Sequence, residues 1–297
     1  MPERKTRHFC VIGDPIGHSL SPLIHNFVFK SLGLDFSYDA VHVSPVGLGD
    51  FMEDSRRSER PGFNVTIPHK QAVIPFLDHL DATAERVGAV NTVHRTGRQL
   101  TGFNTDVHGC RTALIRSEWK PGDGNVVLLG AGGAARAAAE ALGSLGVREL
   151  RLYEIDIPRM ERFISDFKSA GDIITTPLTS ENDLAENLKH SDLLINATPV
   201  GMWPKVDQSP IPQADWITPS SWVFDMVPNP VETLLLRQAK SRGASTIPGL
   251  VMLVAQAIAA DGLWLGRKLP ETLYADVFTH CMKFMEAHGS ASDSHGR

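Results

Sequence analysis

The sequence predicts an α/β fold of two domains, and three observations support this prediction. Apolar strand-like runs alternate with amphipathic helical patterns along the chain, which is typical of α/β proteins. The apolar run 126–129 stops at Gly130-Ala-Gly-Gly133 and is followed by an Ala-rich helical stretch, 134–145. The length of 297 residues, 42% of them hydrophobic, is enough for two ordinary cores.

Alternating apolar and polar residues predict the strands before this glycine turn, and capping residues predict the helix ends. Residues 9–13 form the first expected strand. Residues 22–32 form a helix with Ser21 as N-cap, Pro22 at its first position and Gly33 as its stop. The further elements expected in this part are strands at 36–43, 62–66 and 89–94 and a helix at 106–115.

Beyond the glycine turn, strands and helices alternate as in βαβ units. The Pro-, Ser- and Gln-rich region 204–219 is expected to be a surface loop, and 289–297 a frayed tail. The expected strands are 149–155, 192–196 and 222–225, and the expected helices are 159–168, 250–265 and 271–288.

Composition excludes several classes of protein. The formal charge of -5 and the lack of a basic run argue against nucleic acid as a partner, because phosphate neutralisation needs clustered Lys and Arg. Charge or glycine breaks every apolar stretch before the roughly 20 residues of a spanning helix, so no membrane partner is expected. The first residues lack the apolar core of a signal peptide, and a cytoplasmic location follows.

Cysteine and histidine spacing gives no sign of a metal or redox site. Cys10, Cys110 and Cys281 lie far apart and are expected to be reduced, mostly buried thiols. The twelve histidines show no HExxH or Cys-assisted spacing, so no metal is expected. Ser19 and Ser21 lack the context of a nucleophile elbow, which argues against a hydrolase.

The glycine turn predicts a dinucleotide site. A strand that ends at glycines and continues as a helix brings backbone N–H groups and a helix N-terminus to one point, where a pyrophosphate is stabilised. Glycine at the second and third positions removes side chains that would block the phosphate and the helix–strand contact. The expected pyrophosphate contacts are Gly130, Ala131, Gly132, Gly133 and Ala134.

Two carboxylates favour NAD over NADP. Glu154 and Asp156 follow the next strand, where an acidic residue bonds the adenine ribose and repels a 2′-phosphate. Ile155 stands between them, where a 2′-phosphate would require Arg. Two points weigh against this prediction. In the alternative interpretation Glu154 is only the solvated end of a strand, and Arg151 and Arg159 are close enough in sequence to offer a positive charge there.

Seven strings, in order from about residue 9 to 265, resemble the shikimate dehydrogenase family. They are Gly17-His-Ser-Leu-Ser-Pro22, Asn64-Val-Thr-Ile-Pro-His-Lys70, Gly88-Ala-Val-Asn-Thr92, Gly102-Phe-Asn-Thr-Asp106, Gly130-Ala-Gly-Gly133, Asn196-Ala-Thr-Pro-Val-Gly-Met202 and Gly249-Leu-Val-Met-Leu-Val-Ala-Gln256. The family reduces 3-dehydroshikimate with a nicotinamide cofactor in aromatic amino acid biosynthesis, and its quinate/shikimate branch runs the oxidation with NAD.

The resemblance gives the two domains their expected roles. Residues 1–107 form an α/β substrate-binding domain that 250–288 completes, 108–249 form a doubly wound Rossmann domain for NAD(P), and a cleft separates them. Residues 289–297 are the tail. The predicted cofactor contacts also include Thr198, Val227 and Gly249.

Lys70 and Asp106 are the expected catalytic pair. Hydride transfer between a secondary alcohol and nicotinamide needs a group that gives or takes the hydroxyl proton. A neighbouring carboxylate raises a lysine pKa, which favours Lys70 as the acid in ketone reduction. In the oxidation the proton leaves through Asp106 or water. The structural alternatives are a surface lysine for Lys70 and a helix N-cap for Asp106.

Hydroxyl and amide groups suit a cyclic hydroxy acid as substrate. Ser19 and Ser21 lie beside a helix N-terminus, where two hydroxyls can hold a carboxylate; capping alone is the alternative for Ser21. Neutral hydrogen-bonding groups can meet ring hydroxyls without a charge to desolvate. In the family, the positions of Asn64, Thr66, Asn91 and Gln256 contact the substrate.

Pro228 departs from the family pattern, which usually has a tyrosine that reaches the substrate carboxylate. Shikimate, quinate and another hydroxylated ring acid therefore all stay open as substrates. Two other functions are considered. The first is a non-catalytic cofactor-binding regulator, against which the retention of Lys70 and Asp106 argues. The second is an NAD enzyme for folate or amino-acid substrates, against which Ser19 and Ser21 argue. The expected assembly is a monomer or homodimer.

Overall fold

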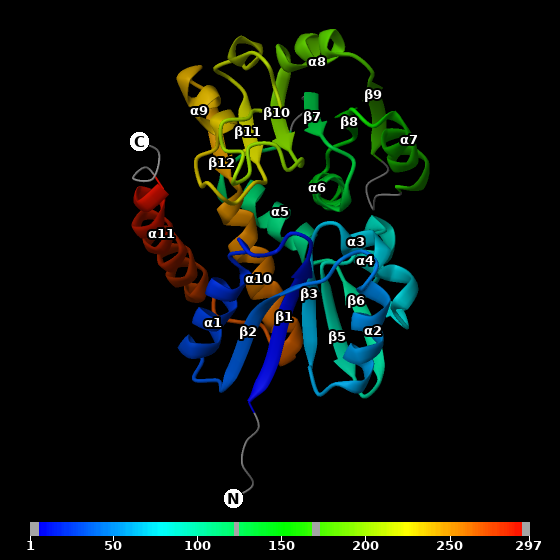
Figure 1. Cartoon of the computed structure of the whole chain (residues 1–297). Coiled ribbons are helices and arrows are strands. Elements are labelled where there is room, and N and C mark those ends of the chain that lie inside the picture. The colour runs from blue at the N-terminus through cyan, green and yellow to red at the C-terminus, as the bar shows by residue number, and fades with distance from the viewer. Residues whose placement is uncertain (1–5, 122–124, 168–172, 293–297) are drawn as a thin grey trace, which may run out of the picture. The chain divides into compact units, whose positions relative to one another are not determined.

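A computed structural model describes residues 6–121, 125–167 and 173–292, and the chain divides into two compact units. The first unit consists of Met1–His79, Asn91–Gly102 and Ala257–Arg297, and the second of Leu80–Val90 and Phe103–Gln256. Each unit contains a β-sheet with helices packed against it (Figure 1), which confirms the predicted α/β fold class.

The first unit is built on a mixed sheet with strand order β2-β1-β3-β5-β6-β4. β1 runs parallel to β2 and β3, whereas β5 runs antiparallel to β3. β1 and β3 therefore end at the same edge of the sheet at which β5 begins. The strands are β1 (Arg7–Gly13), β2 (Phe36–His42), β3 (Gly62–Val65), β4 (His79–Leu80), β5 (Thr92–Thr96) and β6 (Gln99–Phe103).

An aromatic cluster fills the core of the first unit. The ring of Phe9 lies 5.4 Å from that of Phe29 and 4.7 Å from that of Trp264. Trp264 lies against Gly62 and donates a hydrogen bond to the carbonyl oxygen of Val93 (3.0 Å). The helices of this unit are α1 (Ser21–Ser31), α2 (Leu48–Arg57), α3 (His69–Ala72), η1 (Ile74–Phe76), α11 (Thr272–Ser292) and the second half of α10 (Gly249–Leu265).

The second unit contains a six-stranded parallel sheet with the order β12-β11-β10-β7-β8-β9. Counted within the unit from β7, this is the 3-2-1-4-5-6 order of the doubly wound dinucleotide-binding fold, whose strand order reverses between β7 and β10. The strands are β7 (Asn125–Leu129), β8 (Glu149–Tyr153), β9 (Ile174–Leu178), β10 (Ser191–Asn196), β11 (Trp222–Asp225) and β12 (Ser245–Pro248).

Both faces of this parallel sheet are covered, which explains why its strands are continuous apolar runs. Val126 and Leu128 of β7 belong to a core shared with α5, α6 and α7, whereas Val127 and Leu129 belong to a core shared with α8 and α9. The remaining elements of the unit are α4 (Ala82–Val87), α5 (Thr105–Arg116), α6 (Gly133–Ser144), α7 (Ile157–Asp166), α8 (Glu181–Leu188), η2 (Ala214–Trp216) and α9 (Leu234–Ser241).

Several helix and strand ends differ from the sequence-based expectation. Ser21 is the first residue of α1 and not its N-cap, because Leu20 occupies that position without a side-chain bond. β5 begins at Thr92 and not at 89. Asn104, not Asp106, caps α5: its side chain accepts a hydrogen bond from the backbone N–H of Val107. Each difference is small, and helix and strand ends are the part of an element that local sequence patterns define least well.

The chain end differs as well. α11 continues to Ser292, so part of the expected tail is helical; residues 293–297, and Lys168 at the expected end of 159–168, lie outside the described residues. The region 204–219 is irregular apart from η2, as expected. Among the described residues no helix is long and apolar enough to cross a membrane. The three cysteines, all of them within the described residues, are buried and form no disulfide.

Candidate active site

In the first unit, the loops that follow β1 and β3 lie side by side. The backbone N–H of Asp14 donates to the carbonyl oxygen of Ile67 (3.0 Å), and that of Thr66 donates to Ile12 (2.9 Å). A Cβ at Gly13 would come within 2.6 Å of the Thr66 side chain, so only glycine allows this approach. The loop that carries the two serines therefore lies against the segment that leads to Lys70.

The two serines are arranged for anion binding. The oxygen of the Ser19 hydroxyl accepts a hydrogen bond from the backbone N–H of Ser21 (3.2 Å), which leaves the hydroxyl proton to donate. Ser21 opens α1, which has no side-chain N-cap and no acidic residue in its first turn. Within this turn the N–H of Ser21 is already bonded to Ser19, Pro22 has none, and that of Ile24 donates to the carbonyl oxygen of Leu20, so α1 contributes mainly the positive end of its helix dipole beside the Ser19 hydroxyl.

Lys70 lies on the short helix α3, which its neighbour His69 anchors. The His69 ring is buried, and its Nε2 donates to the carbonyl oxygen of Val43 (2.6 Å). This bond fixes α3 beside the end of β2. Lys70 itself is half-buried.

Asn64 and Asn91 lie at this same edge. The backbone N–H of Val65 and the side-chain amide of Asn64 both donate to the carbonyl oxygen of Asn91, at 2.8 Å and 3.0 Å. The first unit thus brings together six of the predicted site residues: Ser19, Ser21, Asn64, Thr66, Lys70 and Asn91.

In the second unit, Asp106 and Gln256 lie on two helices in close contact. A Cβ at Gly109 of α5 would come within 2.8 Å of the Met252 carbonyl of α10. The Thr105 hydroxyl donates to Oε1 of Gln256 (3.3 Å). Asp106 is buried in the first turn of α5, where the helix dipole favours its negative charge.

The glycine turn has the geometry of a phosphate cradle. Gly130 has φ +97°, a conformation that L side chains rarely adopt, and a Cβ there would come within 3.1 Å of the Thr198 side chain. Gly132 is the N-cap of α6 and has no side chain to bond the N–H groups of the first turn. No neighbour lies within 4 Å of the position a Cβ would take at Gly132. These donors therefore suit a dinucleotide pyrophosphate, and the residues present fit such a cofactor.

The carboxylates after β8 are tied to the glycine turn. Glu154 is 8% exposed; its Oε2 accepts from the backbone N–H of Ala131 (3.1 Å) and its Oε1 from that of Asp156 (3.1 Å). It is therefore not the merely solvated strand end considered above. Asp156 caps α7, and the Arg159 guanidinium lies 3.8 Å from Glu154 and 3.5 Å from Asp156.

Comparison with known proteins gives the family. Residues 11–93 match the model of the shikimate dehydrogenase substrate binding domain. A protein named shikimate dehydrogenase (NADP(+)) from Moorella thermoacetica is 39% identical over 275 residues, which cover 92% of each chain. The chain belongs to the shikimate dehydrogenase family. This result confirms the resemblance inferred from the seven strings.

Solved structures of similar proteins agree. Shikimate 5-dehydrogenase from Listeria monocytogenes, in complex with shikimate and NAD, has a TM-score of 0.81 and 32% identity over 93% of this chain and 99% of that one. Quinate dehydrogenase from Corynebacterium glutamicum, in complex with NAD, has a TM-score of 0.82 and 27% identity over 94% of this chain and 99% of that one. Both similarities extend over both units.

A buried polar network, which the sequence did not reveal, supports two of the predicted cofactor contacts in this family member. Asp225, at the end of β11, accepts from Asn196 (2.9 Å), from the backbone N–H of Val227 (3.1 Å) and from the Thr233 hydroxyl (2.5 Å). Asn196 in turn accepts from the backbone N–H and the hydroxyl of Thr198. The string that begins at Asn196 and the expected strand 222–225, which ends at Asp225, were the available signal.

Gly249 allows a further close approach in the second unit. A Cβ there would come within 2.5 Å of the Val227 carbonyl. Gly249 and Val227 are therefore neighbours, and both lie at the edge of the parallel sheet where β7, β8, β10, β11 and β12 end.

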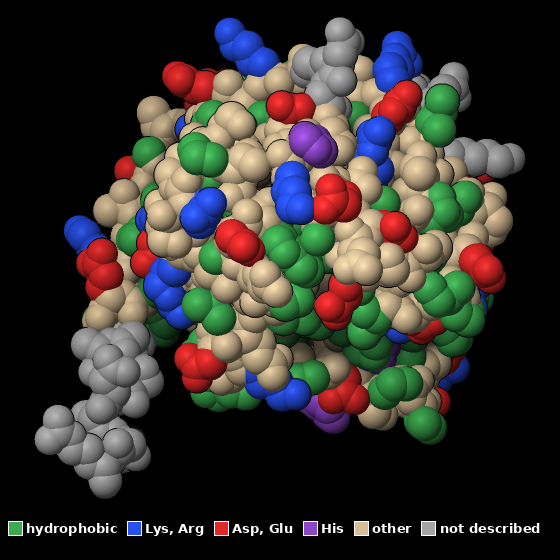
Figure 2. Space-filling view, turned by 90° about the horizontal axis from the view of Figure 1, so that it is seen from above, with side chains coloured by type: hydrophobic (Ala, Val, Ile, Leu, Met, Phe, Trp, Pro, Cys, Tyr) green, Lys and Arg blue, Asp and Glu red, His purple; other side chains and the backbone are tan. Residues whose placement is uncertain are grey.

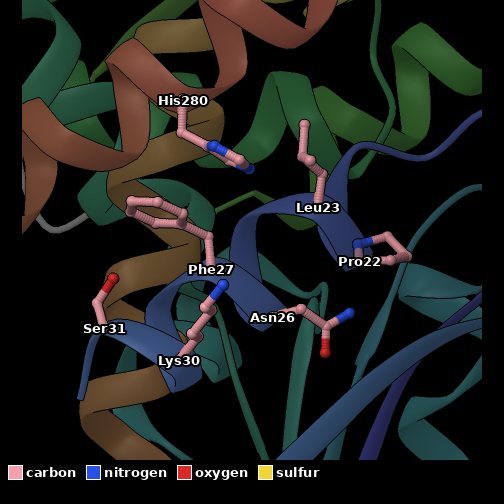
Figure 3. Close-up of a pocket in the computed structure, with 7 residues that line it drawn as sticks. All are labelled: Pro22, Leu23, Asn26, Phe27, Lys30, Ser31 and His280. Carbon is pink, nitrogen blue, oxygen red and sulfur yellow. The ribbon is translucent and has the colours of Figure 1, made fainter. Parts of the chain in front are cut away.

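Other surface features do not belong to this set of residues. α1 and α11 line a hollow in which Phe27 stacks on His280, with ring centroids 4.3 Å apart (Figure 3); none of its lining residues is a predicted site residue. Basic and acidic side chains are mixed on the face in Figure 2. In the described part of the chain, no group of three or more His, Cys, Asp or Glu could hold a metal ion.

Proposed function

We propose that this protein is an NAD(P)-dependent oxidoreductase that transfers a hydride between the cofactor and the ring C3 hydroxyl or ketone of shikimate or quinate. One observation carries the proposal: Lys70 and Asp106 are both retained, each within a string that matches the family, on a chain that also keeps the glycine turn. The three buried cysteines, which form no disulfide in the described structure, support a cytoplasmic enzyme.

Residues 1–107 with 250–288 would bind the ring acid, and 108–249 the cofactor. The pyrophosphate of the dinucleotide would be held by the N–H groups at the start of α6, because those of Gly130 and Ala131 are bonded to Tyr153 and Glu154. The nicotinamide would lie near Thr198, Val227 and Gly249. When bound, the nicotinamide supplies or accepts the hydride at ring C3.

Lys70 donates and accepts the proton of the C3 hydroxyl in this proposal. In the reduction its ammonium group donates a proton to the oxygen at C3, and in the oxidation the proton returns to Lys70 and leaves through Asp106 or water. Ser19 and the first turn of α1 hold the ring carboxylate, while Thr66, Asn91 and Gln256 orient the ring through its hydroxyls.

NAD is the preferred cofactor in this proposal. Glu154 is buried and held against the glycine turn, so its negative charge stays where a 2′-phosphate would approach. Ile155, which is 85% exposed, offers no cation to such a phosphate. Arg159 already faces both carboxylates. The relatives named for NADP(+) provide the opposing argument.

The identity of the ring acid is the second part of the proposal. Pro228 offers no hydroxyl to a carboxylate, which favours a ring acid held differently from shikimate in the usual family site. The similarity to a quinate dehydrogenase makes quinate the first alternative.

Initial rates with shikimate and with quinate, each with NAD and with NADP, test these statements together. We expect higher kcat/KM with NAD; a higher value with NADP would overturn the argument from Glu154. Ile155→Arg should improve kcat/KM for NADP, while Ile155→Ala, the matched control, should not. Binding of NAD without turnover of any ring acid would favour the non-catalytic regulator.

A further inference from the structure

A chain of buried hydrogen bonds runs through three strands of the first unit to Asn91. The Tyr38 hydroxyl contacts Oδ1 of Asn64 (2.6 Å), Nδ2 of Asn64 contacts the Thr92 hydroxyl (2.9 Å), and that hydroxyl contacts Oδ1 of Asn91 (2.9 Å). The four residues are between 0% and 6% exposed. Tyr38 belongs to β2, Asn64 to β3 and Thr92 to β5.

One fixed acceptor sets the direction of the bonds that Asn64 makes. A backbone carbonyl can only accept, so the Asn64 atom that faces the Asn91 carbonyl oxygen at 3.0 Å must be the amide nitrogen. The Oδ1 atom of Asn64 then faces Tyr38, whose hydroxyl must donate. The second amide proton of Asn64 goes to the Thr92 hydroxyl, and in the structure this hydroxyl donates to Oδ1 of Asn91.

The consequence concerns Asn91. Its Oδ1 accepts the Thr92 proton, so Nδ2 is the end of the amide that faces away from this chain. Asn64 uses both amide protons and an oxygen lone pair inside the protein. Its role in the site is therefore exerted through Asn91, and no amide proton of Asn64 remains for a substrate.

The start of the chain is held in place. The Tyr38 ring stacks on the His25 ring, with centroids 4.1 Å apart and planes inclined by 13°. His25 in turn bonds Asp261 (2.7 Å), and both side chains are fully buried. The register of β3 and β5, which places Asn64 opposite Thr92, fixes the other end.

We propose that Tyr38, Asn64 and Thr92 are positioning residues that orient the Asn91 amide so that it donates a hydrogen bond to an oxygen of the ring acid. The substrate class rests on the proposed function, whereas the orientation of the amide does not. An oxygen that accepts from Asn91 is the chemical feature that this site selects. A substrate with only a donor at that point is disfavoured, because two donors would then face each other.

The first test compares Thr92→Val with Thr92→Ser. Valine keeps the shape and removes the hydroxyl, so KM for the ring acid should rise about tenfold, the usual effect of one well-placed hydrogen bond. KM for the dinucleotide should stay unchanged, and the serine variant should restore most of the affinity. Tyr38→Phe should also raise KM for the ring acid, and it replaces the valine variant in the test if that variant does not fold. Tyr274→Phe, on α11, is the matched control for the loss of a tyrosine hydroxyl.

The second test needs no substrate. In a ¹⁵N-labelled protein, the side-chain amide of Asn91 should give one sharp pair of NH₂ signals in the wild type and in Thr92→Ser, and shifted or broadened signals in Thr92→Val. Unchanged signals in Thr92→Val would overturn the inference, as would equal effects of Val and Ser on KM. If the wild type turns over no ring acid but the NMR result holds, the proposed function fails and the inference stands.

Discussion

Asp225→Asn offers a quantitative test of the buried network in the second unit. The Asp225 carboxyl is inaccessible to solvent, and burial raises its pKa to about 6, although the bonds from Thr233, Val227 and Asn196 oppose this shift. An ordinary aspartate has a pKa near 3.9. The folded protein therefore binds a proton here between about pH 4 and 6 that the unfolded chain does not.

This difference fixes the sign and size of a pH effect. A carboxyl whose pKa is raised on folding stabilises the protein at low pH, and this contribution is lost as the pH rises through the folded pKa. About two pKa units correspond to about 3 kcal/mol in total, of which about 1.4 kcal/mol is lost between pH 5 and pH 7.5. Asparagine keeps the shape of the side chain but does not ionise.

The free energy of unfolding should therefore shift in favour of Asp225→Asn by about 1.4 kcal/mol, relative to the wild type, between pH 5 and pH 7.5. Urea unfolding followed by tryptophan fluorescence measures this, because Trp222 lies in the same strand as Asp225. Asp225→Ala should show the same pH slope but lower stability throughout, because three buried donors lose their acceptor. A constant difference between Asn variant and wild type, or one that falls with pH, would refute the reasoning.

Three further results are expected. Lys70→Ala should leave cofactor binding intact and lower turnover by about two or more powers of ten, measured by dinucleotide fluorescence and steady-state rates; a near-wild-type rate would contradict its catalytic role. Gly62→Ala should destabilise the protein by about 1–3 kcal/mol in thermal unfolding, because its Cβ would lie 2.5 Å from the Val93 carbonyl and against Trp264; an unchanged Tm would contradict this packing. Burial raises the pKa values of Cys10 and Cys281 to about 11, so a thiol reagent at pH 8 should react with them slowly in the native protein and quickly in denaturant.

Elements with strong local signals were predicted well. The strand at Trp222–Asp225 coincides with the expected one, and the glycine turn lies between β7 and α6. Gly33, with φ +64°, follows the end of α1 as expected. Helix caps were predicted less well, since Ser21, Asp106 and Asn104 are all chemically able to cap.

Elements with weak local signals were missed. α8 and α9 were not expected, and neither were the strands β9 and β12. β9 carries a proline and is mostly exposed, so its sequence shows little apolar pattern. It becomes a strand because the edge of β8 is available for pairing.

The sequence by itself determined the α/β class, the dinucleotide cradle and the family, because each depends on residue types at fixed spacings along the chain. Tertiary structure decided which polar groups serve the site directly and which support it. Asn64 lies within a family string as a candidate substrate contact, but both protons of its amide go to Asn91 and Thr92. Glu154 was proposed at the ribose position, and only folding shows that it bonds Ala131. Hydrogen-bond partners far apart in the chain are brought together by strand register and burial, which no local pattern specifies.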